Sequence, residues 1–129
     1  MNERVLNVLK ENLWDIATFG DGEVNVVPVA FKNVTDDGRL VIANVFLETT
    51  VKNVLANGKI AVSAYNGKTM EGYQIKGNAV YLTEGGEVDA FKAAVEKAFN
   101  GAMTARGVIS ITPERFIVTT PGPDNKKEL

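Results

Sequence analysis

Two adjacent hydroxyl side chains, Thr49 and Thr50, stand where a short helix is expected to begin. The apolar run 40–46 before them is typical of a strand, and Gly58 has the position of a left-handed helix stop. Backbone N–H groups are free at a helix start and the helix dipole is positive there. The position therefore favours an anion, phosphate above all. From these residues alone, the favoured interpretation is that Thr49 and Thr50 only cap the helix.

The chain contains no histidine and no cysteine. This absence excludes Ser-His-Asp and Cys-His hydrolysis, disulfides and zinc–cysteine sites. Asp36 and Asp37 predict a turn and no metal site, because no further acidic residues follow at ligand spacing. If the protein performs chemistry, we expect a cofactor to bring the reactive group.

Composition narrows the class of protein further. The chain has 129 residues, of which 45% are hydrophobic, and a net charge of -2. We expect one domain with its own core and no basic surface that would bind nucleic acid. There is no apolar run long enough to span a membrane and no apolar signal-peptide core, so we expect a cytoplasmic protein.

Hydrophobic periodicity predicts about seven strands and three helices joined by tight turns. The helices are expected at 4–13, from Glu48, and at 87–100, and the strands at 14–19, 24–34, 40–46, 59–64, 71–82, 108–112 and 115–120. Pro28 inside the second strand indicates a sheet edge, a bulge or an opening. The pattern favours a mainly β (α+β) fold, with an antiparallel sheet closed into a small barrel. Residues 1–123 form the domain, and the polar tail 124–129 is expected to fray.

Several segments, taken in order, carry a resemblance to a known family. They are Ile16-Ala17-Thr18 before the Gly22–Pro28 hairpin, Leu40–Asn44 leading into Thr50–Val54, Ile60–Val62, and Tyr73–Ala79 with its Gly-x-Ala. In this order the chain resembles the FMN-binding split-barrel family, which includes pyridoxamine 5′-phosphate oxidase and small FMN-binding proteins. The resemblance covers about Trp14 to Pro123.

The resemblance implies an antiparallel split β-barrel of the FMN-binding type, and a homodimer with FMN near the subunit interface. The family's phosphate segment falls on Thr49, Thr50 and Asn53. Family members usually carry lysine at the position of Thr49, so Lys52 or Lys76 is a candidate for the missing charge. The set of residues expected to bind the cofactor is Val27, Pro28, Val29, Ala30, Phe31, Asn44, Val45, Phe46, Thr49, Thr50, Asn53 and Gln74.

Three functions stay open at this point. The first is an FMN-dependent oxidoreductase acting on a small molecule, and the second is an electron carrier with bound FMN. The third is a binder of a deazaflavin or another phosphorylated cofactor on the same barrel, without turnover. The short chain favours the carrier slightly. It also lacks the arginine-containing equipment expected for a pyridoxal phosphate substrate.

Overall fold

The computed structural model describes residues 1–129 and contains the expected three helices and seven strands. In chain order they are α1 (Glu3–Glu11), β1 (Trp14–Gly20), β2 (Glu23–Val29), β3 (Lys32–Val34), β4 (Leu40–Asn44), α2 (Glu48–Asn57), β5 (Lys59–Tyr65), β6 (Gly72–Leu82), α3 (Gly86–Ala98) and β7 (Gly107–Val118). Asn2 caps α1 by accepting a 2.8 Å hydrogen bond from the backbone N–H of Arg4. Gly58 ends α2 at a φ of 69°, as its position predicts.

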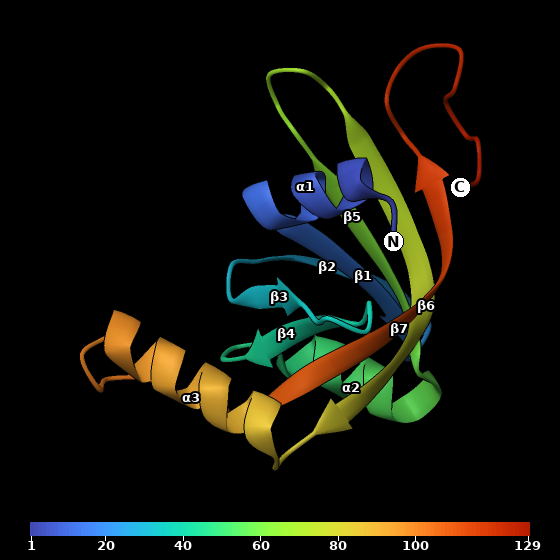
Figure 1. Cartoon of the computed structure of the whole chain (residues 1–129). Helices are drawn as coiled ribbons and strands as arrows, with labels where there is room; N and C mark the ends of the chain where they lie inside the picture. Colours follow the sequence, from blue (N-terminus) through green and yellow to red (C-terminus); the bar gives the residue numbers. More distant parts are fainter.

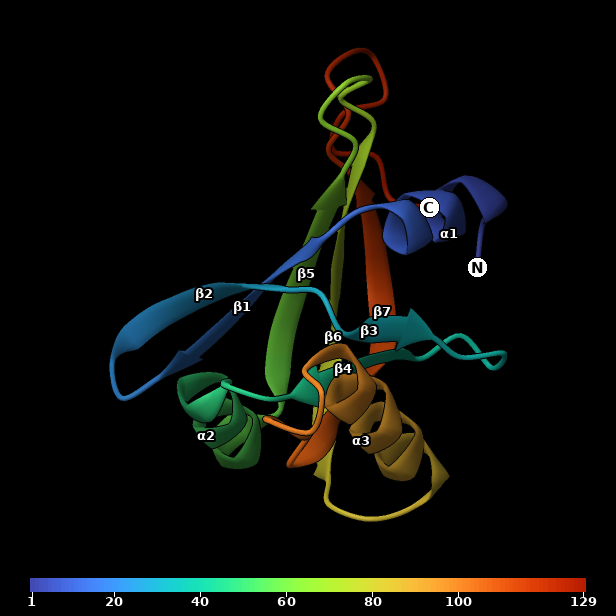
Figure 2. The same cartoon turned by 90° about the vertical axis from the view of Figure 1, so that its left-hand side faces the viewer.

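All seven strands belong to one antiparallel sheet in the order β2-β1-β5-β6-β7-β4-β3. The sheet curls into a half-barrel (Figures 1 and 2). Its two edge strands, β2 and β3, are consecutive in the chain. Only Ala30 and Phe31 separate β2 from β3. The predicted antiparallel barrel is confirmed, with a split between these two edges.

The core fills the inside of the curl, and the helices close it. Inward residues that alternate along the strands, such as Ile16, Val62 and Ile75, are completely buried. Helix α1 adds Leu9 to this core and α2 adds Val54. Helix α3 packs on β4 and β7 through two smaller apolar clusters. None of the helices is long and apolar enough to cross a membrane.

Two of the expected strand assignments are wrong. The predicted strand 24–34 is two strands, because the chain leaves β1 after Val29 and turns to pair with β4. The predicted strands 108–112 and 115–120 are one strand, β7, which runs through Pro113. A register shift opposite Lys76 and Gly77 accommodates the proline, which lacks an N–H.

Two further predictions are wrong, one about the start of α2 and one about the C-terminal tail. No side chain caps α2: its N-cap residue is Leu47, and Glu48, Thr49 and Thr50 form the first turn. The tail 124–129 is not frayed. It folds back along β7, where the backbone N–H of Leu129 donates to the carbonyl of Phe116 at 2.9 Å. The tail thereby pairs with the part of β7 that extends beyond β4.

Candidate functional site

Two adjoining cavities lie where the end of β2 faces the segment between β4 and α2. The first, of about 160 Å³, is lined by Pro28, Val29, Ala30, Phe31, Ala43, Val45, Phe46, Leu47 and Phe99. The second, of about 230 Å³, is lined by Asn25, Val27, Phe46, Leu47, Glu48, Thr49 and Thr50. Phe46 and Leu47 line both cavities, so the two adjoin, and we refer to them together as the groove. The structure thus brings nine of the twelve predicted site residues to this groove.

The first half of the groove is apolar. Eight of its nine lining residues are hydrophobic. The rings of Phe31 and Phe99 lie 5.9 Å apart at an angle of 50°, and the side chain of Phe46 is 72% exposed at the groove. Aromatic walls of this kind suit a flat, apolar ring.

The second half of the groove is polar and lies at the start of α2. The backbone N–H groups of Glu48, Thr49 and Thr50 donate no hydrogen bond, and the first N–H bonded within the helix is that of Val51, to the carbonyl of Leu47 at 2.9 Å. These free donors and the positive end of the dipole favour an anion. Thr49 is exposed, whereas Thr50 is fully buried and its Oγ1 accepts a 3.2 Å hydrogen bond from Asn25 Nδ2.

A positive charge beside this helix start comes from Arg106. Its Nη1 lies 3.9 Å from Glu48 Oε1, in the first turn of α2. Its backbone N–H donates to the carbonyl of Asn44 at 2.8 Å, which anchors the residue next to the end of β4. No sequence signal points to this approach, because it depends on the pairing of β7 with β4.

The two lysines considered for this charge lie elsewhere. Lys52 forms a 2.6 Å ion pair with Asp21, in the turn between β1 and β2. This pairing raises the pKa of Lys52 and lowers the pKa of Asp21. Lys76 lies on β6 with its side chain on the outer face of the sheet, since the neighbouring Ile75 is buried in the core.

Three predicted site residues lie outside the groove lining. The amide of Asn44 donates to Tyr81 Oη at 2.8 Å and accepts from the backbone N–H of Leu47 at 2.8 Å. This holds the turn into α2. Asn53 is buried between α2 and β1. Gln74 lies on the outer face of β6, away from the groove of its own chain.

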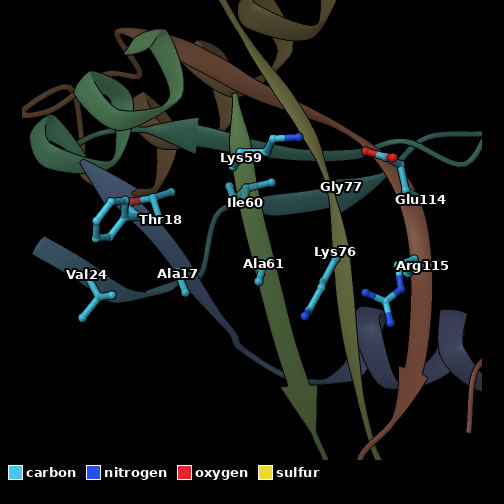
Figure 3. Close-up of a pocket in the computed structure, with 11 residues that line it drawn as sticks. Ala17, Thr18, Val24, Lys59, Ile60, Ala61, Lys76, Gly77, Glu114 and Arg115 are labelled. Atoms are coloured by element: carbon cyan, nitrogen blue, oxygen red, sulfur yellow. The ribbon is translucent and has the colours of Figure 1, made fainter. Parts of the chain in front are cut away.

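A third cavity, of about 450 Å³, lies on the outer face of the sheet (Figure 3). Its floor includes the small residues Ala17 and Ala61, and it also contains Lys59, Lys76 and Arg115. Arg115 pairs with Glu128 of the folded-back tail. Neither lysine has an acidic side chain within ion-pair distance. Sequence reasoning did not find this cavity, because its residues come from five different strands.

The model of the pyridoxamine 5′-phosphate oxidase family matches residues 2–120. The chain belongs to this family. A curated family relative, an uncharacterised protein of Methanocaldococcus jannaschii, is 33% identical over 130 residues, which cover 98% of this chain and 86% of the relative.

Solved structures agree with the pyridoxamine 5′-phosphate oxidase fold. HupZ of Group A Streptococcus superposes with a TM-score of 0.81 at 25% identity, covering 96% of this chain and 98% of HupZ. An FMN-binding protein of Syntrophomonas wolfei superposes with a TM-score of 0.80 at 15% identity, covering 94% of this chain and 87% of that protein. The predicted family and the predicted split-barrel fold are therefore confirmed.

Proposed function

We propose that the chain is a redox protein that binds FMN in the groove, with the ring in the apolar half and the phosphate at the start of α2. The observation that carries this proposal is that the two halves adjoin. An aromatic-lined cavity and a cavity at a helix start with free N–H donors share Phe46 and Leu47 as lining residues. A flat ring joined to a phosphate has this same polarity from end to end.

The phosphate contacts would come from the backbone and from one arginine. The N–H groups of Glu48, Thr49 and Thr50 point along the helix axis toward an anion. Arg106 lies close enough to Glu48 to exchange its ion pair for the phosphate, and both side chains are largely exposed. Arg106 would thereby supply the charge that a lysine at position 49 supplies in the resembling family. Asn44 and Asn53 would support the site indirectly. Asn44 holds the turn into α2, and Asn53 holds α2 on β1.

Bound FMN would supply reversible transfer of hydride or electrons. The groove itself contributes binding and shielding from water, since its apolar half carries no charged side chain. Glu48 is the only acidic residue that lines the groove, and it lies at the helix start. We therefore propose electron transfer, or FMN-dependent oxidoreduction of a small molecule, as the activity. No lysine or arginine lines the groove itself, and Arg106 beside it is the one cation placed to hold a phosphate.

The proposal includes a homodimer with FMN near the subunit interface. Gln74 lies on the outer face of the sheet and cannot contact a ring held in the groove of its own chain. A second copy that covers the rim of the groove could contribute Gln74 and would also cover the exposed ring of Phe46. A dimer therefore reconciles the expected role of Gln74 with its place in the fold.

The test is titration of the purified protein with FMN and, separately, with riboflavin, which lacks the phosphate. We expect a flavin absorption spectrum, release of FMN on denaturation identified by mass spectrometry, and weaker binding of riboflavin. Arg106→Gln should weaken FMN binding several-fold and leave riboflavin binding unchanged. Arg4→Gln, on the exposed side of α1, is the matched control.

Three results would count against the proposal. A protein that binds neither flavin would exclude FMN, and mass spectrometry of the native protein would then identify another cofactor, such as a deazaflavin. Equal loss of FMN and riboflavin in Arg106→Gln would place the phosphate away from Arg106. Equal affinity of the unaltered protein for the two flavins would remove the phosphate site altogether.

A further inference from the structure

Three asparagines in the chain are followed directly by glycine: Asn57, Asn66 and Asn100. Such an asparagine can lose its side-chain amide spontaneously, because the backbone nitrogen of the next residue attacks the side-chain carbonyl and glycine has no Cβ to obstruct the approach. The three sites therefore start with the same local chemistry. Asn57 and Asn66 also share the lysine that follows the glycine, so they form a matched pair that differs in its place in the fold.

The attacking nitrogen is held at two of these sites. The backbone N–H of Gly58 donates to the carbonyl of Val54 at 2.9 Å, where α2 ends. The backbone N–H of Gly101 donates to the carbonyl of Glu96 at 2.8 Å, after the last turn of α3. At Asn57 the departing amide is held as well, because its Nδ2 donates to a β1 carbonyl at 2.7 Å. Attack at either site would first have to break the end of a helix.

The corresponding groups are free at Asn66, in the hairpin loop between β5 and β6 at one end of the sheet (Figures 1 and 2). The backbone N–H of Gly67 donates no hydrogen bond, and the Nδ2 of Asn66 has no partner in the chain. Gly67 is exposed, and nothing lies within 4 Å of the position that a Cβ would take there. Hydroxide and water can therefore reach the reacting atoms.

The side-chain carbonyl of Asn66 is also polarised by the loop. Its Oδ1 accepts hydrogen bonds from the backbone N–H groups of Lys68 at 2.9 Å and Thr69 at 3.3 Å. Attack at Cγ turns this oxygen into an oxyanion, and donors already aimed at a developing oxyanion lower the barrier to its formation. The Oδ1 of Asn57 accepts one such bond, from the N–H of Lys59, but the attacking nitrogen is not free there. Asn66 alone combines a free nucleophile, a free leaving group and a polarised carbonyl.

We propose that Asn66 is the site at which the folded protein loses an amide, with aspartate and isoaspartate as the products. Hydroxide removes the proton from the Gly67 nitrogen, which then forms a bond to Asn66 Cγ. The Cγ–Nδ2 bond breaks, and Nδ2 takes a proton from water and leaves as ammonia, so a succinimide ring remains. Water then opens the ring at either of its carbonyls. The net change is one water consumed and one ammonia released, without an oxidant, a metal or a cofactor.

The two products have different effects on the hairpin. Aspartate keeps both backbone donors, now in charge-assisted hydrogen bonds. Isoaspartate routes the backbone through the side-chain carbons and so lengthens the loop. The N–H of Asn66 donates to the carbonyl of Glu71, and the carbonyl of Asn66 accepts from the N–H of Met70, both at 2.8 Å. We expect the isoaspartate form to lose these closing bonds, and Glu71 pairs with Arg4, so the change would extend to α1.

Peptide mapping by mass spectrometry tests the site in the full-length protein. The protein is kept in warm, mildly alkaline buffer made with heavy-oxygen water, which labels only the amides lost during the incubation, and is then digested in ordinary water. We expect Asn66 to react at least about tenfold faster than Asn57 or Asn100, because backbone donors to an oxyanion can supply this factor. Methylation by an isoaspartyl methyltransferase detects the isoaspartate, and hydrogen exchange at the Met70 amide should be faster in that fraction.

Unfolding and one variant provide the matched controls. In urea the rates at Asn57 and Asn66 should converge to within about twofold, because both are then Asn-Gly-Lys segments of a flexible chain. In the folded protein, Gly67→Ala should slow the loss at Asn66 at least about tenfold, since the added Cβ obstructs the attack and contacts nothing else in the fold. The rate at Asn57 should not change in this variant.

Equal rates at the three sites of the folded protein, or faster loss at Asn57 or Asn100, would overturn the proposal. So would a folded protein that keeps all three amides while the protein in urea loses them, since the loop would then protect Asn66. A preference for Asn66 that persists unchanged in urea would assign it to the neighbouring sequence and overturn the role of the loop. None of these outcomes depends on whether the protein binds a flavin.

Discussion

Asn53 joins helix α2 to strand β1 through a 3.0 Å hydrogen bond from its Nδ2 to Thr18 Oγ1, and both side chains are buried. The other side of the same amide approaches Gly20, where an added Cβ would lie 1.9 Å from Asn53 Oδ1. The helix that begins at the polar half of the groove is thus positioned on β1 by one amide. Asn53 can affect cofactor binding through the placement of α2.

Asn53→Ala should lower the free energy of unfolding by about 1–3 kcal/mol, because a buried hydrogen bond is lost and Thr18 Oγ1 keeps no donor. The double variant Asn53→Ala/Thr18→Val should lose less unfolding free energy than the sum of the losses in the two single variants, because both changes remove the same hydrogen bond. Urea denaturation of the two single variants and the double variant measures this coupling. Asn7→Ala, exposed on α1, is the control. Strict additivity would show that the two side chains do not interact.

Gly77→Ala should be more destabilising than Gly20→Ala. A Cβ on Gly77 would lie 2.4 Å from the backbone oxygen of Thr112, which is held in the sheet, whereas a Cβ on Gly20 meets the side-chain amide of Asn53, which can move if it gives up its hydrogen bond to Thr18. We expect a loss of about 1–3 kcal/mol for Gly77→Ala. Chemical denaturation checks the order, with Gly67→Ala as a control in open space. The reverse order would mean that β7 yields more easily than Asn53.

Thr49→Lys should strengthen FMN binding by a factor of about 1.4 to 5, since an added cation near a bound phosphate is worth about 0.2–1 kcal/mol at an exposed site. Riboflavin affinity should not change. Fluorescence titration at low and high salt measures the effect, which salt should weaken. Thr69→Lys, in the β5–β6 loop, controls for net charge. If both flavins gain equally, the lysine does not act on the phosphate.

The folded-back tail should detach in acid. Its hydrogen bond and ion pair with Arg115 lower the pKa of Glu128 below the ordinary value of 4.5. The contribution of this pair to tail docking is therefore complete above pH 4.5 and is lost as the pH falls through the lowered pKa. The NMR shift of the Leu129 amide, which is bonded to Phe116, should report the release. Glu128→Gln should remove this transition, and a transition that survives in the variant would belong to another group.

Alternation and turn signals predicted the three helices and most of the strands, because both are local properties of the chain. Pro28 and Pro113 show where that reasoning stops. Pro28 lies within β2 on the sheet edge, where its missing N–H is tolerated. Pro113 lies inside a strand whose bulge appears only when β6 is aligned beside it.

The candidate site was predictable where it follows a short segment and not where distant strands meet. Nine of the twelve expected residues line the groove because they lie in two short segments, 27–31 and 45–50, that face each other across it. Arg106 and Phe99 were missed, since their approach depends on α3 and β7 folding back onto β4. The cavity on the outer face of the sheet depends in the same way on cross-strand register, which a single sequence does not disclose.

The place of β7 between β6 and β4 has a consequence for synthesis on the ribosome. The β3–β4 hairpin has no strand partner other than β7, the last strand of the chain. A nascent chain that has emerged only as far as α3 can form the β2-β1-β5-β6 sheet and the β3–β4 hairpin. The edges of β4 and β6 that later pair with β7 must stay unpaired. Those open edges are templates for association with other chains. We therefore expect folding to complete only after β7 has left the exit tunnel.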